Sequence, residues 1–534
     1  MCIRTRALPP LALTSADFPT SVAGFFMNAQ PARPSQTRSF STIFLIELWE
    51  RFGYYGMAAL LVLFMVEKIK LGDTQANLIW GAFTALVYAA PAIGGWIGDK
   101  VLGARRTMTI GAAILALGYL LLSVPSDNLY MMYLSMGVIV VGNGMFKANA
   151  ANLVRRIYEG DDAKIDSAFT LYYMAVNVGS TVSMLLTPWI KDQWGWHAAF
   201  AVCSGGLILG LINYYFMMRT LDGVGSPPDE KPVRWDRLAM VLGGGVVALF
   251  VVAFIVQHME IARACVYLAG LAILGIFVYM IAKGARSERA GLVAALILVA
   301  ETLLFFIFYQ QMSTSLTLFA LRNVDWNQYF FGMHLFTWSP AQYQALNPIW
   351  IMLLSPILAW TYTHLGKSNR DLPIAGKFAI GFAVVAVGFF IYGLGAGTAV
   401  DGKVSSWYMI WGYGFYSLGE LLVSGLGLAM IARYVPVRMG GFMMGAYFVA
   451  TGISQYLGSV VANYASIPDN ITDPLESLAI YTSLFNNLGF LAVGGTVLAV
   501  ILLPLMKRLS ASHSAKDAVT HSAAGGLRTV AAEE

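Results

Sequence analysis

Apolar residues follow one another along this chain in runs that are too long for a soluble fold. A bilayer-spanning helix needs about 20 mostly apolar residues, and about fourteen runs of this length are separated by short polar segments. An even number of spans places both ends of the chain on one side of the membrane. The pattern therefore predicts an all-α membrane protein. The expected spans are residues 40–66, 77–99, 106–124, 129–153, 168–190, 197–218, 238–258, 263–283, 291–320, 344–365, 374–397, 406–431, 440–463 and 480–506.

Composition and charge agree with a lipid environment. Of 534 residues, 58% are hydrophobic and 12% are charged, whereas soluble domains have about 25% charged residues. Twenty-six of the 34 lysines and arginines fall on the side of the termini and six on the other side. Cytoplasmic loops carry the excess of basic residues, so we expect both termini in the cytoplasm. The basic residues form no single patch, which argues against a nucleic-acid partner, and the three cysteines show neither metal nor disulfide spacing.

A segment rich in glycine, proline and charge, residues 219–237, separates six spans from the following eight. Two bundles of six helices that rock about a central site are a common transporter layout. We therefore expect two additional helices between the bundles. Met27 opens a segment typical of a natural start, which predicts that residues 1–26 are an extension. The predicted divisions are a disordered tail (1–38), an N-terminal bundle (39–218), a linker with two helices (219–290), a C-terminal bundle (291–508) and a second disordered tail (509–534).

The first span carries a polar stripe. At about 100° per residue, Glu47, Glu50, Arg51, Tyr54 and Tyr55 share one helical face. Each charge within a bilayer costs about 2.5–3.5 kcal/mol on insertion scales, so this face is expected to lie in a polar cavity. The stripe is either an ion pair that fixes two helices together or a site for a proton or a charged solute.

Two further charges lie deep within spans. Lys147 has no acid on its own helix, so its partner must come from another helix, and Glu47 and Glu50 are the candidates. Glu420 has no lysine or arginine inside a span of the second half to pair with. A ligand that is positive at one end and negative at the other would bridge Glu420 to Arg51 and Lys147. The alternatives are a structural salt bridge for Lys147 and a proton-only role for Glu420.

Uncharged polar residues accompany these groups. Asn177 and Asn347 are suited to bind a peptide backbone, or else form a hydrogen bond between helices. Tyr88, Tyr309 and Tyr447 are candidates for the cavity wall, although most tyrosines in such a chain pack or lie at the membrane interface.

The turn after the second span has a motif of its own. It runs Gly94-Gly-Trp-Ile-Gly-Asp99-Lys-Val-Leu-Gly103-Ala-Arg105-Arg106 and resembles the cytoplasmic loop signature of the major facilitator superfamily. That resemblance implies that Asp99 and Arg105 hold neighbouring helix ends together as part of a gate. An ordinary hydrophilic turn is the alternative.

Several motifs, in this order, resemble the proton-dependent oligopeptide transporter family of that superfamily over nearly the whole chain after residue 38. They are Glu47-x-x-Glu50-Arg51 with Tyr54-Tyr55, Phe146-Lys147-x-Asn149, Tyr172-Tyr173-x-x-x-Asn177-x-Gly179-Ser180, Gly195-Trp196-His197-x-x-Phe200, Leu346-Asn347-Pro348 and Gly419-Glu420-Leu-Leu-x-Ser424.

The resemblance implies a proton-coupled symporter of di- and tripeptides in the bacterial inner membrane, with no cofactor other than the coupling proton. Glu47, Glu50, Arg51 and Lys147 would take part in proton coupling. Arg51 and Lys147 would also face the peptide carboxylate, and Glu420 would face its amino terminus. The expected substrate site contains Arg51, Tyr54, Tyr55, Tyr88, Lys147, Asn177, Gln310, Asn347, Glu420, Ser424 and Tyr447.

Two positions depart from the family pattern. Many members have an acid near where this chain has Tyr309-Gln310-Gln311, and a glutamine carries no proton, so that step is either absent here or moved to Glu301. Many also have a tryptophan where Tyr447 stands.

Other functions remain as alternatives. Proton-coupled transport of nitrate or an amino acid is the nearest one, and the complete Glu-x-x-Glu-Arg stripe favours a peptide. A membrane enzyme would need a catalytic or metal constellation that the six histidines do not form, and a channel would need a filter motif.

Overall fold

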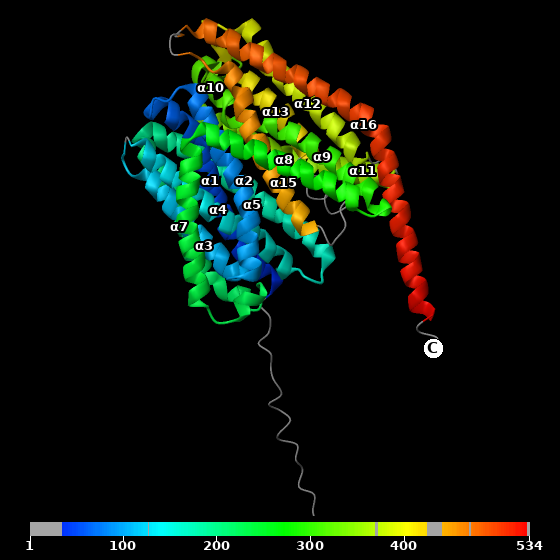
Figure 1. Ribbon diagram of the computed structural model, residues 1–534. Coiled ribbons are helices and arrows are strands. Elements are labelled where there is room, and N and C mark those ends of the chain that lie inside the picture. The colour runs from blue at the N-terminus through cyan, green and yellow to red at the C-terminus, as the bar shows by residue number, and fades with distance from the viewer. Residues whose placement is uncertain are drawn as a thin grey trace, which may run out of the picture.

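Helices make up the membrane-spanning part of this protein (Figure 1). The computed structural model describes residues 35–126, 128–368, 372–423, 440–468, 471 and 473–530. In these ranges, eleven helices are long and apolar enough to cross a membrane. The all-α prediction is confirmed. The long helices are α1 (Gln36–Leu63), α2 (Asp73–Lys100), α3 (Ala104–Ser123), α4 (Leu129–Ile157), α5 (Asp162–Trp194), α6 (Trp196–Met217), α7 (Trp235–Gln257), α8 (Met259–Lys283), α9 (Arg286–Gln310), α11 (Leu346–Lys367), α12 (Ile374–Leu394), α13 (Ser406–Val423), α15 (Gly440–Ala462) and α16 (Pro474–Val530).

The helices pack as two bundles. In the first, α1 lies against α5 and α6, α3 against α4 and α6, and α2 against α4. In the second, α12 lies against α13 and α16, and α9 against α15 and α16. The bundles meet most extensively between α2 and α15. Helices α7 and α8 lie outside both bundles, with α7 beside α4 and α8 beside α15 (Figure 1).

Glycines allow the helices of these interfaces to approach closely. A Cβ atom at Gly94 on α2 would overlap the carbonyl of Gly144 on α4. A Cβ at Gly452 on α15 would come within 2.6 Å of the carbonyl oxygen of Ala85 on α2. Lipid tails are as apolar as the helix side chains, so the hydrophobic effect does little to hold membrane helices together. Close van der Waals packing does this instead, and small residues allow it.

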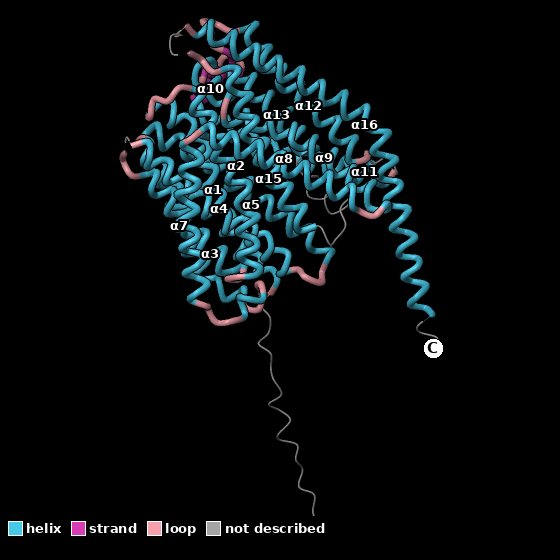
Figure 2. The backbone as a smooth tube through the Cα atoms, viewed as in Figure 1, coloured by secondary structure: helices cyan, strands magenta, loops and turns pink. Residues whose placement is uncertain are grey.

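The molecule has two ends, which we call proximal and distal. The proximal end holds the start of α1 and the α2–α3 turn, and the chain enters and leaves on this side (Figure 1). The distal end holds all the described strands (Figure 2). There β1 (Val324–Asp325) pairs in parallel with β4 (Val404–Ser405), and β2 (Asn327–Phe330) pairs antiparallel with β3 (Met333–Thr337).

The predicted span 291–320 is not one continuous helix. Helix α9 ends at Gln310, a 3-10 turn follows at Gln311–Ser313, and α10 (Ser315–Asn323) begins after Thr314. The Gln311 side chain donates to the carbonyls of Ile307 and Gly458, at 3.0 and 2.9 Å. A break at membrane depth is tolerated because side chains satisfy the freed backbone groups.

The predicted terminal tails differ in outcome. Helix α1 begins at Gln36, inside the expected tail 1–38, where the Ser35 side chain accepts a hydrogen bond from the Arg38 amide. Residues 1–34 lie outside the described chain. Helix α16 continues to Val530, beyond the expected end of the C-terminal bundle at residue 508.

Candidate functional site

The polar stripe of α1 is buried in the N-terminal bundle. The exposed fractions of Glu47, Glu50 and Arg51 are 2%, 0% and 3%. The Arg51 Nε atom lies 2.8 Å from Glu47 Oε1 and 2.7 Å from Glu50 Oε2. Neighbours four residues apart share a helical face, so α1 itself supplies the guanidinium between the two carboxylates. The stripe is thus a compact group of two acids and one base.

Lys147 does not have the partner that the sequence suggested. In the described chain it forms no ion pair with Glu47 or Glu50 within 4.0 Å, because Arg51 on the same helix already occupies those carboxylates. The Lys147 Nζ atom instead lies 4.6 Å from the centroid of the Tyr88 ring on α2. A cation over an aromatic face is attracted by the ring quadrupole.

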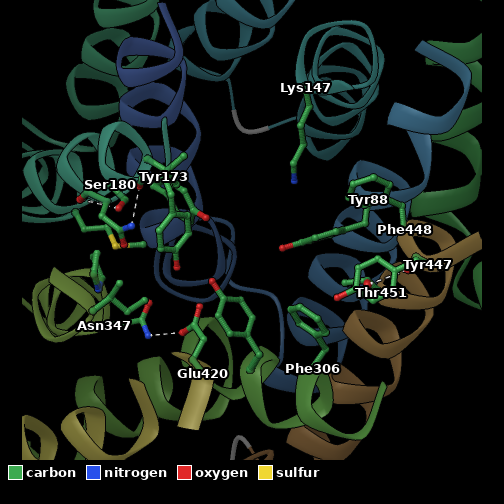
Figure 3. Close-up of a pocket in the computed structure, with 17 residues that line it drawn as sticks. Tyr88, Lys147, Tyr173, Ser180, Phe306, Asn347, Glu420, Tyr447, Phe448 and Thr451 are labelled. Carbon is green, nitrogen blue, oxygen red and sulfur yellow. Dashed lines mark hydrogen bonds between the residues drawn. The ribbon is translucent and has the colours of Figure 1, made fainter. Parts of the chain in front are cut away.

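A cavity of about 270 Å³ lies between the two bundles (Figure 3). Figure 3 shows Lys147 pointing into it from one side and Glu420 from the other. Lys147 comes from α4 of the first bundle, and Glu420 comes from α13 of the second. The two bundles therefore present opposite charges to one shared space.

Glu420 is held by its neighbours on the second bundle. The Asn347 Nδ2 atom donates to Glu420 Oε2 at 2.7 Å and to Ser417 Oγ at 3.0 Å. Asn347 lies at the start of α11, and Glu420 is 7% exposed. The carboxylate is thus fixed at the cavity wall without a cationic partner among the described side chains.

Hydrogen bonds join the two bundles on the distal side of the cavity. The Gln310 Nε2 atom donates to Ser459 Oγ at 2.9 Å and to Thr84 Oγ1 on α2 at 3.4 Å. The Gln344 Nε2 atom donates to the carbonyl of Ala59 on α1, at 3.2 Å. These contacts close the distal side between the bundles. Gln310 belongs to this closure and not to the cavity wall.

Glu301 is a buried acid outside the cavity wall. It is 5% exposed, and neither of its carboxylate oxygens has a hydrogen-bond partner in the described part of the chain. That Glu301 takes over the proton-binding role of the acid missing near Gln310 stays a prediction.

At the proximal end, Asp99 and Arg105 bind different groups rather than each other. Asp99 Oδ1 accepts from Asn152 Nδ2 on α4 at 2.8 Å and from Ser226 Oγ at 3.1 Å. Arg105 Nη1 donates to the carbonyl of Leu221 at 2.9 Å. Both residues therefore hold neighbouring segments at the end of the N-terminal bundle.

The segment after α6 folds onto this turn. The carboxylate of Asp229 accepts from the backbone amides of Arg105 and Arg106 at the start of α3, at 3.2 and 3.5 Å. Gly103 precedes α3 with φ +103°, and a Cβ there would overlap that carboxylate. The predicted linker is thus anchored to the first bundle.

A known family model matches most of the chain, including the α4, α5, α11 and α13 residues that line the cavity. The model described as "POT family" matches residues 105–479, which is more than half of the chain. The chain belongs to the POT family.

Two curated POT relatives cover almost the whole chain. Dipeptide and tripeptide permease B of Aliivibrio fischeri (strain MJ11) is 40% identical over 486 residues, covering 91% of this chain and 97% of the relative. Dipeptide and tripeptide permease A of Escherichia coli (strain K12) is 40% identical over 484 residues, covering 90% and 95%.

Solved POT-like structures share the fold. The crystal structure of tetrameric PepTSo2 has a TM-score of 0.82 at 58% identity, covering 89% of this chain and all of that chain. A bacterial homologue of the human drug peptide transporters PepT1 and PepT2 has a TM-score of 0.82 at 61% identity, with the same coverage. The predicted fold of two six-helix bundles with two additional helices, that of the major facilitator superfamily, is confirmed.

Not all of the predicted substrate residues of this POT chain line the cavity. Arg51 and Tyr54 lie behind the cavity wall, with the Arg51 Cζ atom 5.8 Å from the centroid of the Tyr54 ring. Ser424 lies outside the described residues. The predicted residues that do line the cavity are Tyr55, Tyr88, Lys147, Asn177, Tyr309, Asn347, Glu420 and Tyr447.

Several wall residues were missed from the sequence. Tyr173, Val176, Ser180 and Met184 line the cavity beside Asn177 on α5. Their spacing around Asn177 is that of one helical face, so extending the face by one turn backwards and two turns forwards would have found them. Phe306 and Phe448 also line the cavity, and an isolated phenylalanine in an apolar span carries no such signal.

Proposed function

We propose that this protein is a proton-coupled symporter that imports di- and tripeptides by alternating access. It would lie in the bacterial cytoplasmic membrane with both termini inside, so that the distal end faces outward. Protons are the coupling ion and no other cofactor is required.

The observation that carries the proposal is the opposite charge of the two cavity walls. Lys147 on α4 and Glu420 on α13 face the same space. A peptide is positive at its amino terminus and negative at its carboxyl terminus, so it complements both walls at once. Binding would join the two bundles through the ligand, as alternating access requires. The peptide permeases that share 40% of the sequence support this substrate class.

The α1 stripe supplies the element that responds to protons. Arg51 pairs with both Glu47 and Glu50, and all three groups are buried. A proton on either acid weakens its attraction for Arg51 and alters the charge balance beside Lys147. One charge that crosses 100 mV yields about 2.3 kcal/mol, which supports roughly fifty-fold accumulation of substrate.

Uptake by purified protein in proteoliposomes tests the transport claim. Labelled dialanine should accumulate faster when the lumen is negative and the outside is acidic. The symport proposal is wrong if dialanine uptake responds to neither gradient. Competition by single amino acids, dipeptides, tripeptides, tetrapeptides and nitrate separates a peptide site from the alternative of another anion or zwitterion.

Variants of the stripe test the coupling claim. Glu47→Gln and Glu50→Gln should abolish gradient-driven uptake, because each removes a proton-binding group, while counterflow exchange of dialanine remains. Glu260→Gln, at an exposed site on α8, is the control for loss of a carboxylate. Driven uptake that survives unchanged in both stripe variants would reject this assignment.

A further inference from the structure

Three buried residues of the N-terminal bundle, Glu50, Tyr119 and Asn143, carry polar side-chain atoms without a partner in the described chain. Although Glu50 lies 2.7 Å from Arg51 Nε, neither of its oxygens accepts a well-formed hydrogen bond in the described chain. The Tyr119 hydroxyl and both amide atoms of Asn143 also have no partner there. The exposed fractions of Glu50, Tyr119 and Asn143 are 0%, 0% and 1%. Buried polar groups are partnered in about 90% of cases or more, so this group needs an explanation.

Three helices bring these side chains to one level of the bundle. The Tyr119 ring on α3 contacts α1 at Gly53, where a Cβ would come within 2.8 Å of it. Glu50 lies one turn before Gly53 on α1 and is therefore closer than Tyr119 to the proximal end. On α4, a Cβ at Gly142 would lie 2.6 Å from the backbone nitrogen of Leu115, one turn before Tyr119. Asn143, next to Gly142, is therefore at the height of Glu50.

Asn143 also connects this group to the cavity. It lies four residues before Lys147, and residues four apart share a helical face. Lys147 lines the cavity and is near enough to Glu50 to interact with its charge. Asn143 thus lies one helical turn along α4 from the lysine of the cavity wall.

We propose that Asn143 and Tyr119 are positioning residues that hold Glu50 in both of its protonation states; this rests on the proposed proton coupling. When Glu50 is ionised, the Asn143 amide N–H and the Tyr119 O–H donate to its oxygens. When Glu50 binds a proton, its O–H donates to Asn143 Oδ1. An asparagine fits this task because its side chain carries both donors and an acceptor. These bonds form directly or through a buried water with two to four polar partners.

Other ionisable groups lie near Glu50. From α1 these are Glu47, Arg51, Tyr54 and Tyr55, and from the neighbouring helices they are Tyr119 on α3, Lys147 on α4 and Tyr172 on α5. Asn143 differs from all of them because it has no charge and both donates and accepts. Asn143 can therefore change from hydrogen-bond donor to acceptor when Glu50 gains a proton, and it does not bind that proton itself.

The test is the pH dependence of dialanine uptake in proteoliposomes, expressed relative to counterflow by the same sample. Asn143→Leu and Tyr119→Phe each remove a donor to the ionised carboxylate, which destabilises the ionised form more than the protonated form. The external pH of half-maximal driven uptake should therefore move up, by about one pH unit for Asn143→Leu. Asn143→Thr keeps a hydroxyl that donates and accepts, and should shift the profile by less than half as much.

The control is Tyr392→Phe in the second bundle. The Tyr392 hydroxyl is also buried and without a partner in the described chain, but it lies away from the α1 stripe. Its removal should leave the pH profile unchanged. If Asn143→Leu fails to fold, the test is made with Tyr119→Phe alone. This variant keeps the aromatic ring and removes only the hydroxyl oxygen.

Two outcomes overturn the inference. One is a pH profile of both variants that superimposes on that of the unmodified protein and of Tyr392→Phe. The other is an equal loss of driven uptake and counterflow without a pH shift, which indicates a structural role. The variant Glu50→Gln separates failure of the proton-coupling proposal from failure of the positioning role. If Glu50→Gln keeps driven uptake, the proton-coupling proposal fails. If Glu50→Gln abolishes driven uptake but Asn143→Leu and Tyr119→Phe cause no pH shift, only the positioning role fails.

Discussion

Arg322 on α10 forms two parallel hydrogen bonds with Asp73 at the first residue of α2. The Arg322 Nη1 and Nη2 atoms lie 2.6 and 2.7 Å from the two carboxylate oxygens of Asp73. Asp73 belongs to the first bundle and α10 follows the first helix of the second, so this fork joins the bundles at the distal rim. Arg322 also donates to the Tyr481 hydroxyl at 2.8 Å.

Replacing Arg322 by alanine should open the distal side. It leaves the Asp73 carboxylate, which is 3% exposed, without its ion pair. We expect a loss of about 2 kcal/mol from the closed state, less than the roughly 3–5 kcal/mol of a fully buried pair, because a quarter of the Arg322 side chain is exposed. A cysteine at Tyr88, in a chain with Cys2 and Cys265 replaced by serine, should react faster with an impermeant maleimide added from the distal side.

The control for this variant is Arg263→Ala. Arg263 pairs with Glu260 on the same helix, α8, so its removal breaks no contact between the two bundles. Equal labelling rates in the two variants would show that the Arg322–Asp73 pair does not hold the distal side closed.

Glu420→Gln should weaken binding of peptides with a free amino group by at least about tenfold, since it removes the negative charge of that wall. Binding of N-acetyl-dialanine should change little, because its amino end has no charge. Ser417→Ala is the comparison variant and should weaken peptide binding less, since Ser417 contacts Asn347 and does not line the cavity. Equal losses for blocked and free peptides in a competition assay would assign Glu420 another role.

Gln310→Glu should make distal closure depend on pH. The protonated acid keeps an O–H that can donate to Thr84 or Ser459, as the amide does. The ionised acid would place a charge at a site that is 3% exposed, which is costly. Closure should therefore weaken as the pH rises and the introduced acid ionises, and recover as the pH falls. The measurement is maleimide labelling at Tyr88→Cys across pH, with Gln310→Met as the uncharged control. A flat profile in Gln310→Glu would show that the closed state does not depend on this contact.

Asp229→Ala should destabilise the proximal end of the N-terminal bundle. The variant removes the side-chain acceptor of two amides at the start of α3, and loss of such a cap costs about 1 kcal/mol. The melting temperature in detergent should fall by a few degrees. Glu230→Ala, at the exposed neighbouring residue, should leave it unchanged. Matching melting temperatures for both variants would contradict a capping role.

The sequence by itself determined the number and order of the spans and the polar face of α1. Both follow from local rules: apolar length is set by bilayer thickness, and a helix brings Glu47, Glu50 and Arg51 to one side. It also indicated Arg51, Lys147 and Glu420 as charges that need a shared polar space, because charges are costly in lipid, although Arg51 lies behind the wall of that space. The motif comparison then predicted the family.

Only the tertiary structure decided which groups meet. Lys147 was expected to pair with an acid of α1 and instead lies over Tyr88, since Arg51 is nearer to both carboxylates. Gln310 lies in the closure between the bundles and not in the cavity wall. These outcomes depend on helix rotation and on competition between residues far apart in the chain. A hydrophobicity pattern specifies which face of a helix is polar, but not which neighbouring helix that face will meet.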